Sequence, residues 1–164
     1  MAIFDELDQR LSIVPRWVVL RTIQRQSVAE HCFNVERIAV QIAMEWFRIA
    51  NVKELHEISQ LALHHDDEEA ITGDIPSPAK EPKSEAEIEE DLKFVAYAIV
   101  KLADIMEAYW FLRMEIAMGN QYVAEHAFQT GQRALAYAER LGRREQMAEW
   151  LITMATNMES RSYG

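Results

Sequence analysis

The sequence has little of what builds disulfide-bonded, turn-rich or membrane-spanning proteins. Its one cysteine, Cys32, cannot form an intramolecular disulfide, which excludes a secreted disulfide scaffold. Five glycines and four prolines are too few for a turn-dense β architecture. No apolar run approaches the length of a membrane span, and the acidic N-terminal residues do not resemble a signal peptide. We therefore expect a soluble, cytoplasmic protein that does not contact a membrane.

Basic residues are also in deficit. Lysine and arginine number 17 against 27 aspartates and glutamates, which gives a formal net charge of −10. Binding to a nucleic-acid polymer needs a basic surface that displaces counterions, so such a polymer is not expected as a partner. A small anionic ligand remains compatible with this charge, provided that a local basic cluster or a metal ion attracts it.

What the sequence does have is helix-forming composition and helical periodicity. The chain has 164 residues, of which 49% are apolar, enough for one domain covering 1–164. Ser27 and Glu30 have the spacing of a capping box, so a helix should begin there, and an earlier helix should end before Pro15. The expected helices cover about 3–11, 28–46, 53–65, 85–118, 121–141 and 144–158. The predicted fold is a compact all-α bundle of about six helices.

Three metal-ligand residues fall on the apolar faces of these helices. His31 stands three residues after Val28, His65 continues the apolar stripe of its helix, and Asp104 is flanked by apolar residues one turn away on either side. Burying an ionised aspartate without a partner costs several kcal/mol, which a divalent cation would offset. Asp66, beside His65, would add a fourth ligand. Spacing alone also allows each histidine to be a satisfied core residue.

Two imidazoles and two carboxylates suit one divalent transition metal, namely Mn²⁺, Co²⁺, Fe²⁺, Ni²⁺ or Zn²⁺, rather than Ca²⁺. Such a cation can polarise phosphorus and lower the pKa of an attacking water. The same residues occur with further motif residues along the chain. These are Arg16-Trp17, Glu69, Thr72-Gly73-Asp74, Pro76, Pro78, Ala79-Lys80 and the VKLAD segment that ends at Asp104.

This combination, from Arg16 to about Asn120, resembles the YfbR-like HD-domain 5′-deoxynucleotidases. The resemblance implies the HD-domain fold and a metal-dependent phosphohydrolase acting on 2′-deoxynucleotides in a bacterial cell, with a phage-encoded origin also compatible. The metal ligands that it implies are His31, His65, Asp66 and Asp104. It also assigns Glu69, together with the metal-ligating Asp66, to catalysis through the attacking water.

The substrate-binding residues implied by the resemblance lie at both ends of the same stretch. Arg16 matches a phosphate contact, Trp17 an aromatic that leaves no space for a 2′-hydroxyl, and Asp74 an acceptor for the sugar 3′-hydroxyl. Lys101, one helical turn before Asp104, has the spacing to reach a phosphate on the metal, and Lys80 would suit a longer phosphate chain. Taken without the resemblance, Trp17 is equally explained as core, Glu69 as a solvated acidic face and Asp74 as a turn residue.

Three alternatives remain open at this stage. The stretch between Asp66 and Asp104 is shorter than in bacterial members of the family, which predicts a more open pocket and leaves the number of phosphates undecided. Small phage HD enzymes resemble this chain too, so a deoxynucleoside triphosphate, dATP included, is the alternative substrate. A non-catalytic helical ligand-sensing module is the third alternative.

Apolar residues of the last two predicted helices would cover either the core or a second copy in a homo-oligomer: Phe128, Leu135, Trp150 and Leu151.

Overall fold

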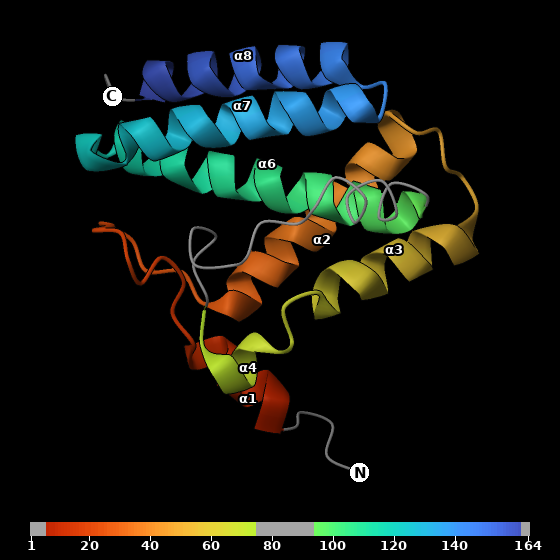
Figure 1. Ribbon diagram of the computed structural model, residues 1–164, viewed down its shortest axis with the longest axis horizontal. Helices are drawn as coiled ribbons and strands as arrows, with labels where there is room; N and C mark the ends of the chain where they lie inside the picture. Colours follow the sequence, from red (N-terminus) through yellow and green to blue (C-terminus); the bar gives the residue numbers. More distant parts are fainter. Residues whose placement is uncertain (1–5, 75–93, 162–164) are drawn as a thin grey trace.

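The computed structural model describes residues 6–74 and 94–161, and the regular elements among these residues are helices (Figure 1). The elements are α1 (Glu6–Ile13), α2 (Val28–Glu45), α3 (Val52–His64), α4 (Glu69–Thr72), α6 (Val95–Ala117), the 3-10 helix η2 (Gln121–Val123), α7 (Ala124–Arg140) and α8 (Arg144–Arg161). The described residues contain no strand, only an isolated antiparallel bridge between Pro15 and Ser27. The predicted all-α fold is confirmed. None of the described helices is long and apolar enough to span a membrane.

The predicted capping box sets the start of α2. The Glu30 backbone N–H donates to Ser27 Oγ at 3.2 Å, and the Ser27 N–H donates to Glu30 Oε2 at 2.7 Å. Because these two bonds satisfy backbone donors that a helix start otherwise leaves unpaired, they fix where the helix begins. His31 lies on the apolar face that α2 packs against the core, with Val28 and Val35, and its side chain is fully buried.

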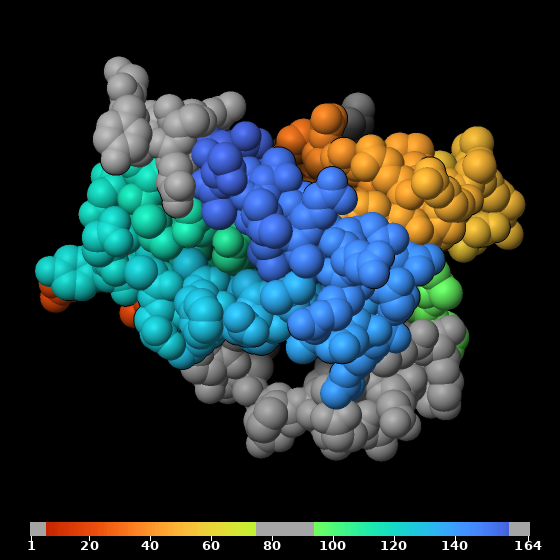
Figure 2. All heavy atoms as spheres, turned by 90° about the horizontal axis from the view of Figure 1, so that it is seen from above, coloured from red at the N-terminus to blue at the C-terminus, as the bar shows by residue number. Residues whose placement is uncertain are grey.

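The long helix α6 forms the centre of the fold. In Figure 1, α2 crosses behind α6, α3 lies below α6, and α7 and α8 lie above it. Figure 2 shows α7 and α8 side by side across one face of the molecule. A helix covered on opposite sides must be apolar around most of its circumference, which explains why so many residues of α6 are buried. The main core consists of Val35, Ala39, Ile42, Ala43, Ile58, Ala62, Ile99, Val100, Leu102, Ala103, Ile105, Met106, Ala134, Ala138 and Met147.

The segment between α1 and α2 is not helical and is held against the far end of α6. Glu115, fully buried on α6, accepts hydrogen bonds from the backbone N–H groups of Ile23 at 2.6 Å and Gln24 at 2.8 Å. Asn120 donates to the backbone carbonyl of Arg21 at 2.8 Å. These contacts satisfy backbone groups of the segment that no helix pairs, and they hold residues 21–24 against the C-terminal end of α6.

The helices differ from the predicted ones in two of their starts and in one additional element. The helix expected from about residue 85 begins at Val95 in the described part of the chain, and residues 75–93, with most of the predicted proline loop, lie outside the described residues. The predicted stop at Gly119 is confirmed, with a positive φ of 97° that favours glycine. The next helix begins with one 3-10 turn, and α4 is a short element that the periodicity did not predict.

The apolar residues of the last two helices mostly face the core. Leu135, Trp150 and Leu151 pack against the main core cluster, whereas Phe128 is 62% exposed. Three of the four residues that the sequence offered to a partner are therefore used within the chain. The predicted homo-oligomer remains a prediction.

Candidate active site

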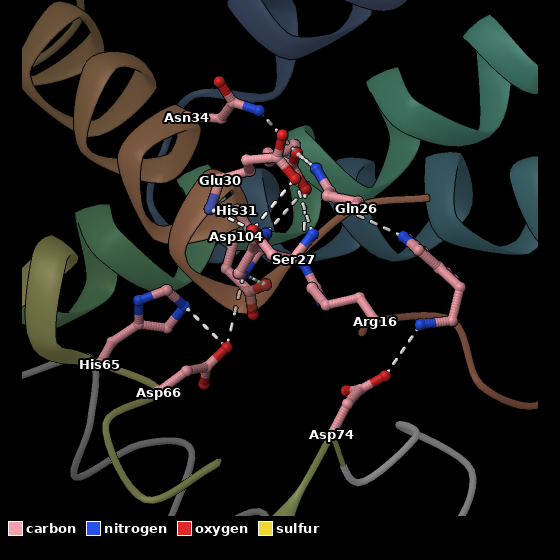
Figure 3. Close-up of polar contacts among 12 residues, drawn as sticks. Arg16, Gln26, Ser27, Glu30, His31, Asn34, His65, Asp66, Asp74 and Asp104 are labelled. Carbon is pink, nitrogen blue, oxygen red and sulfur yellow. Dashed lines mark hydrogen bonds and ion pairs between the residues drawn. The ribbon is translucent and has the colours of Figure 1, made fainter. Parts of the chain in front are cut away.

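Three helices bring the four predicted metal ligands together. His31 comes from α2, His65 and Asp66 from the turn directly after α3, and Asp104 from α6. His31 Nε2 lies 3.4 Å from Asp104 Oδ1 and 3.5 Å from Asp66 Oδ2. Asp66 Oδ2 lies 3.3 Å from His65 Nε2, so its dashed contacts join both imidazoles in Figure 3. Ligand atoms of His31, His65 and Asp104 all lie within 4.8 Å of one another.

The hydrogen bonds of the two histidines indicate that this cluster fits a cation. His31 Nδ1 donates to Glu107 Oε2 at 2.8 Å, and His65 Nδ1 donates to the backbone carbonyl of Ala62 at 2.7 Å. Neither Nε2 atom has a hydrogen-bond partner among the described residues, although both are buried. An acceptor held at Nδ1 leaves the lone pair for Nε2, which is the usual arrangement of a metal-ligating histidine. A divalent cation would give both nitrogens and the neighbouring carboxylates a shared partner.

The charges around His31 favour replacement of its proton by a metal. Burial and the Arg16 guanidinium lower the pKa of His31, but the carboxylates of Asp104, Asp66 and Glu107 outweigh them and raise it to about 10. Burial instead lowers the pKa of His65 below its ordinary value. Without a cation, His31 is therefore protonated at neutral pH while His65 is neutral. The surplus of negative charge that keeps this proton is what a divalent ion would neutralise.

Cys32 offers a second donor set with His65 and Asp66, because their ligand atoms also lie within 4.8 Å of one another. Only a thiolate ligates well. Burial and the nearby Asp66 charge raise the pKa of Cys32 to about 12, which keeps the thiol protonated. The set of His31, His65 and Asp104 is the better ligand set.

A cavity of about 820 Å³ opens beside these ligands. Its walls include three of the predicted metal ligands, His65, Asp66 and Asp104, and the predicted substrate residues Arg16, Trp17, Asp74 and Lys101. They also include the apolar residues Val19, Leu20, Leu61, Val100, Ile105, Ala108 and Leu112, and four polar residues of α7, namely His126, Gln129, Thr130 and Arg133. The cavity volume is that of a small-molecule site, and its lining combines charged and polar groups with apolar side chains. It suits a ligand with an anionic group and an apolar ring.

Trp17 is held rigidly in the wall of this cavity. Its φ is 62°, a left-handed conformation that a bulky residue adopts only at a cost in free energy. Its backbone N–H donates to Asp74 Oδ2 at 2.9 Å, and its indole N–H donates to Gln26 Oε1 at 3.1 Å. The ring stacks on Phe111, with centroids 5.2 Å apart and planes 7° from parallel. These contacts hold Trp17 in its strained conformation, so its ring forms a fixed surface.

The other predicted catalytic and substrate-binding residues differ in whether they reach the cavity. Lys101 Nζ donates to Asp104 Oδ2 at 2.6 Å, so it binds a candidate ligand carboxylate rather than standing free. Glu69 begins α4 and is 5% exposed; it is not among the described residues that line the cavity, whereas its exposed neighbour Glu68 is. Lys80 lies outside the described residues.

Sequence reasoning missed two buried polar residues, Gln26 and Glu107. Glu107 is fully buried on α6, one turn beyond Asp104. Burial tends to raise the pKa of Glu107, but the hydrogen bond and charge of His31 and the charge of Arg16 hold it below its ordinary value, so the carboxylate is ionised. The available signal was an acidic residue at helical spacing from Asp104. That signal also occurs at Glu115, which anchors backbone and not the site.

Comparison with known proteins agrees with this geometry. The model of the 5′-deoxynucleotidase YfbR-like family matches residues 4–95. A 5′-deoxynucleotidase of Vibrio cholerae is 28% identical over 181 residues, covering 92% of this chain and 91% of the relative. The 5′-deoxynucleotidase yfbR of Photorhabdus temperata is 30% identical over 143 residues, covering 68% of this chain and 72% of the relative.

A solved structure shares the fold. It is the cyanophage S-2L HD phosphohydrolase DatZ bound to dA and one catalytic Zn²⁺ ion, which matches with a TM-score of 0.71 and 18% identity over 98% of this chain and 99% of that one. The predicted HD-domain fold is thereby confirmed. With a family model that spans more than half of its residues, the chain belongs to the YfbR-like 5′-deoxynucleotidase family of HD-domain phosphohydrolases.

Proposed function

We propose that this protein removes the 5′-phosphate from deoxynucleoside monophosphates, giving a deoxynucleoside and inorganic phosphate. One divalent transition metal would be held by His31, His65, Asp66 and Asp104. The observation that carries the proposal is the pair of buried Nε2 atoms, which meet two carboxylates at one end of a nucleotide-sized cavity. We further propose that the protein acts in the cytoplasm of a bacterial or phage-infected cell, in keeping with its bacterial relatives.

The bound cation would polarise a phosphoryl oxygen and lower the pKa of the attacking water. The side chains of the chain then have separate tasks. Arg16, at the cavity wall, binds the remaining phosphate oxygens through its fork of N–H donors. Glu69 takes a proton from the water as the water oxygen attacks phosphorus and the bond from phosphorus to O5′ breaks, and this proton then passes to the departing O5′ oxygen. Asp66, one of the residues that would hold the cation, would orient the same water.

Trp17 and Asp74 would select the sugar. Asp74 accepts the backbone N–H of Trp17 through Oδ2, and a carboxylate has lone pairs for more than one donor, so it can also accept the sugar 3′-hydroxyl. That shared carboxylate places the 3′-hydroxyl next to the fixed Trp17 ring. A 2′-hydroxyl would collide with the ring, which gives selection for deoxyribose.

A second candidate is hydrolysis of a deoxynucleoside triphosphate to the deoxynucleoside and tripolyphosphate. The observation in its favour is the pair of cations Lys101 and Arg133, which both line the cavity and lie close enough to interact electrostatically. Together with the predicted contact from Lys80, they would suit a longer phosphate chain.

A product screen tests both candidates. The purified protein is incubated with deoxynucleoside mono- and triphosphates of each base, with Mn²⁺, Co²⁺ and Zn²⁺ in turn. Orthophosphate released from monophosphates supports the first candidate, and tripolyphosphate released from triphosphates supports the second. No product from any of these substrates with any of these metals would refute both.

A further inference from the structure

Among the described residues, Glu107 is a buried carboxylate that accepts hydrogen bonds from several side chains and has no role in the reaction steps proposed above. Glu107 lies on α6 with no exposed surface, and an ionised carboxylate in that position costs several kcal/mol unless donors surround it. Its two oxygens face four side chains. The donors are His31 Nδ1 at 2.8 Å and Arg16 Nη1 at 3.5 Å on Oε2, and Gln26 Nε2 at 2.6 Å and Asn34 Nδ2 at 3.3 Å on Oε1.

Toward the proposed metal site, Glu107 determines the ring orientation and the tautomer of His31. A hydrogen bond from Nδ1 to a carboxylate fixes the orientation of the ring and leaves Nε2 as the ligand atom. His31 Nε2 points at Asp66 and Asp104, at 3.5 and 3.4 Å. Without an acceptor at Nδ1, the ring could rotate or exchange its tautomer, and the cation would lose one correctly aimed ligand.

Toward the cavity, Glu107 positions Gln26 and Arg16, and through Gln26 it positions Trp17. Gln26 donates from Nε2 to Glu107 and accepts the Trp17 indole N–H through Oε1. Since one end of the amide can only donate and the other can only accept, the negative charge of Glu107 sets the orientation of Gln26 and hence the partner of the indole. Arg16, the proposed phosphate contact, meets the same carboxylate as His31.

We propose that Glu107 is a positioning residue. It orients Nε2 of His31 toward the cation and, through Gln26 and Arg16, fixes where the substrate wall, meaning the part of the cavity formed by Arg16 and Trp17, lies relative to that cation. This inference rests on the metal-dependent activity proposed above. Figure 3 shows Gln26 and Arg16, from the segment between α1 and α2, close to His31 of α2. The deoxyribose-selecting wall and the metal site thereby share one buried negative charge.

The variant that tests this role is Glu107→Gln, which keeps shape and removes charge. An amide has one acceptor oxygen, so its NH₂ group must face either His31 Nδ1 or the Gln26 amide, and one donor meets another. The matched control is Glu115→Gln, which neutralises another fully buried carboxylate on α6 whose partners are the Ile23 and Gln24 backbone and Asn120. Both variants should lower the melting temperature.

The readout is Mn²⁺ binding to the metal-free protein by titration calorimetry. Glu107→Gln should bind Mn²⁺ between tenfold and a hundredfold more weakly than wild type, the range observed when outer partners of metal ligands are removed. Glu115→Gln should stay within twofold. Equal Mn²⁺ affinity in Glu107→Gln and wild type would overturn the proposal, whatever the substrate screen finds.

The coupling to the substrate wall has its own readout at saturating Mn²⁺. For the best deoxynucleotide in the screen, Glu107→Gln should raise KM as well as lower kcat, and the ratio of deoxynucleotide to ribonucleotide kcat/KM should fall at least fivefold. Glu115→Gln should keep this ratio. An unchanged ratio in Glu107→Gln would show that Glu107 serves the metal site alone and overturn the link to the wall.

The wild-type protein supplies a measurement that needs no folded variant. In the Zn²⁺-loaded protein, long-range ¹H–¹⁵N spectra should show a slowly exchanging proton on His31 Nδ1 and an unprotonated, Zn²⁺-shifted Nε2. Zinc on Nδ1, or a rapidly exchanging Nδ1 proton, would overturn the proposal. If the screen finds no turnover but this pattern holds, the proposed function fails and the positioning of His31 stands.

Discussion

Lys101 Nζ lies 2.6 Å from Asp104 Oδ2, while Asp104 Oδ1 faces His31 Nε2 at 3.4 Å. One oxygen of the carboxylate is therefore held by a lysine and the other is turned to the metal site. This lysine opposes a cation electrostatically even as it orients a ligand. It also lines the cavity, where a phosphate would meet it.

Replacing this lysine should separate the two effects. Lys101→Met should tighten Mn²⁺ binding about threefold to tenfold, because a positive charge beside the site is removed. The same variant should raise KM for the deoxynucleotide, because a cation facing its phosphate is lost. Calorimetry and steady-state kinetics check both numbers. Weaker Mn²⁺ binding would mean that orienting Asp104 is the larger contribution of Lys101.

Glu69 and Glu68 form a pair for testing the proposed proton acceptor. Glu69 is buried at the start of α4, whereas Glu68 is exposed and lines the cavity. Glu69→Gln should lower kcat at least a hundredfold, the scale of general base catalysis, with Mn²⁺ affinity within threefold of wild type. Glu68→Gln should keep at least half of the activity. If Glu68→Gln loses the activity and Glu69→Gln keeps it, the exposed glutamate is the base.

Metal binding should release one proton in neutral buffer. The neighbouring carboxylates raise the pKa of His31 to about 10, so its Nε2 proton is present at pH 7.5 and must leave when a metal arrives. Burial lowers the pKa of His65, which is already neutral and contributes no proton. Calorimetry in buffers of different ionisation enthalpy should give about one proton released per Mn²⁺, and the affinity should rise about tenfold per pH unit from pH 7 to 9. Zero protons released would contradict a protonated His31.

Trp17 should control the choice between deoxyribose and ribose. Trp17→Ala removes the fixed ring and should lower the preference for deoxynucleotides over ribonucleotides at least tenfold, mainly by raising ribonucleotide turnover. Phe111→Leu keeps an apolar side chain but removes the aromatic ring stacked on Trp17, so it should lower the preference by a smaller factor. Competition assays with matched deoxy- and ribonucleotides measure the ratio. An unchanged ratio in Trp17→Ala would assign sugar selection elsewhere.

Much of the fold was predictable because its signals are local. The capping box at Ser27 and Glu30 is written in four consecutive residues, and its two hydrogen bonds are formed as expected. The inward position of His31 follows from its helical spacing to Val28 and Val35. The 3-10 turn before α7 and the short α4 carry no such pattern, because their backbone is set by packing against neighbours.

The candidate site also has features that follow from local sequence and features that depend on contacts between distant residues. The sequence by itself determined that His31, His65 and Asp104 face inward, and its motif residues pointed to the family, because helical spacing and ligand chemistry are properties of the chain. Only the tertiary structure decided that Glu107 supports His31, that Gln26 joins Trp17 to that carboxylate, and that Lys101 binds Asp104. Glu107 and Glu115 cannot be distinguished by their spacing on the helix. The role of each depends on which distant donors the fold brings within hydrogen-bonding distance of it.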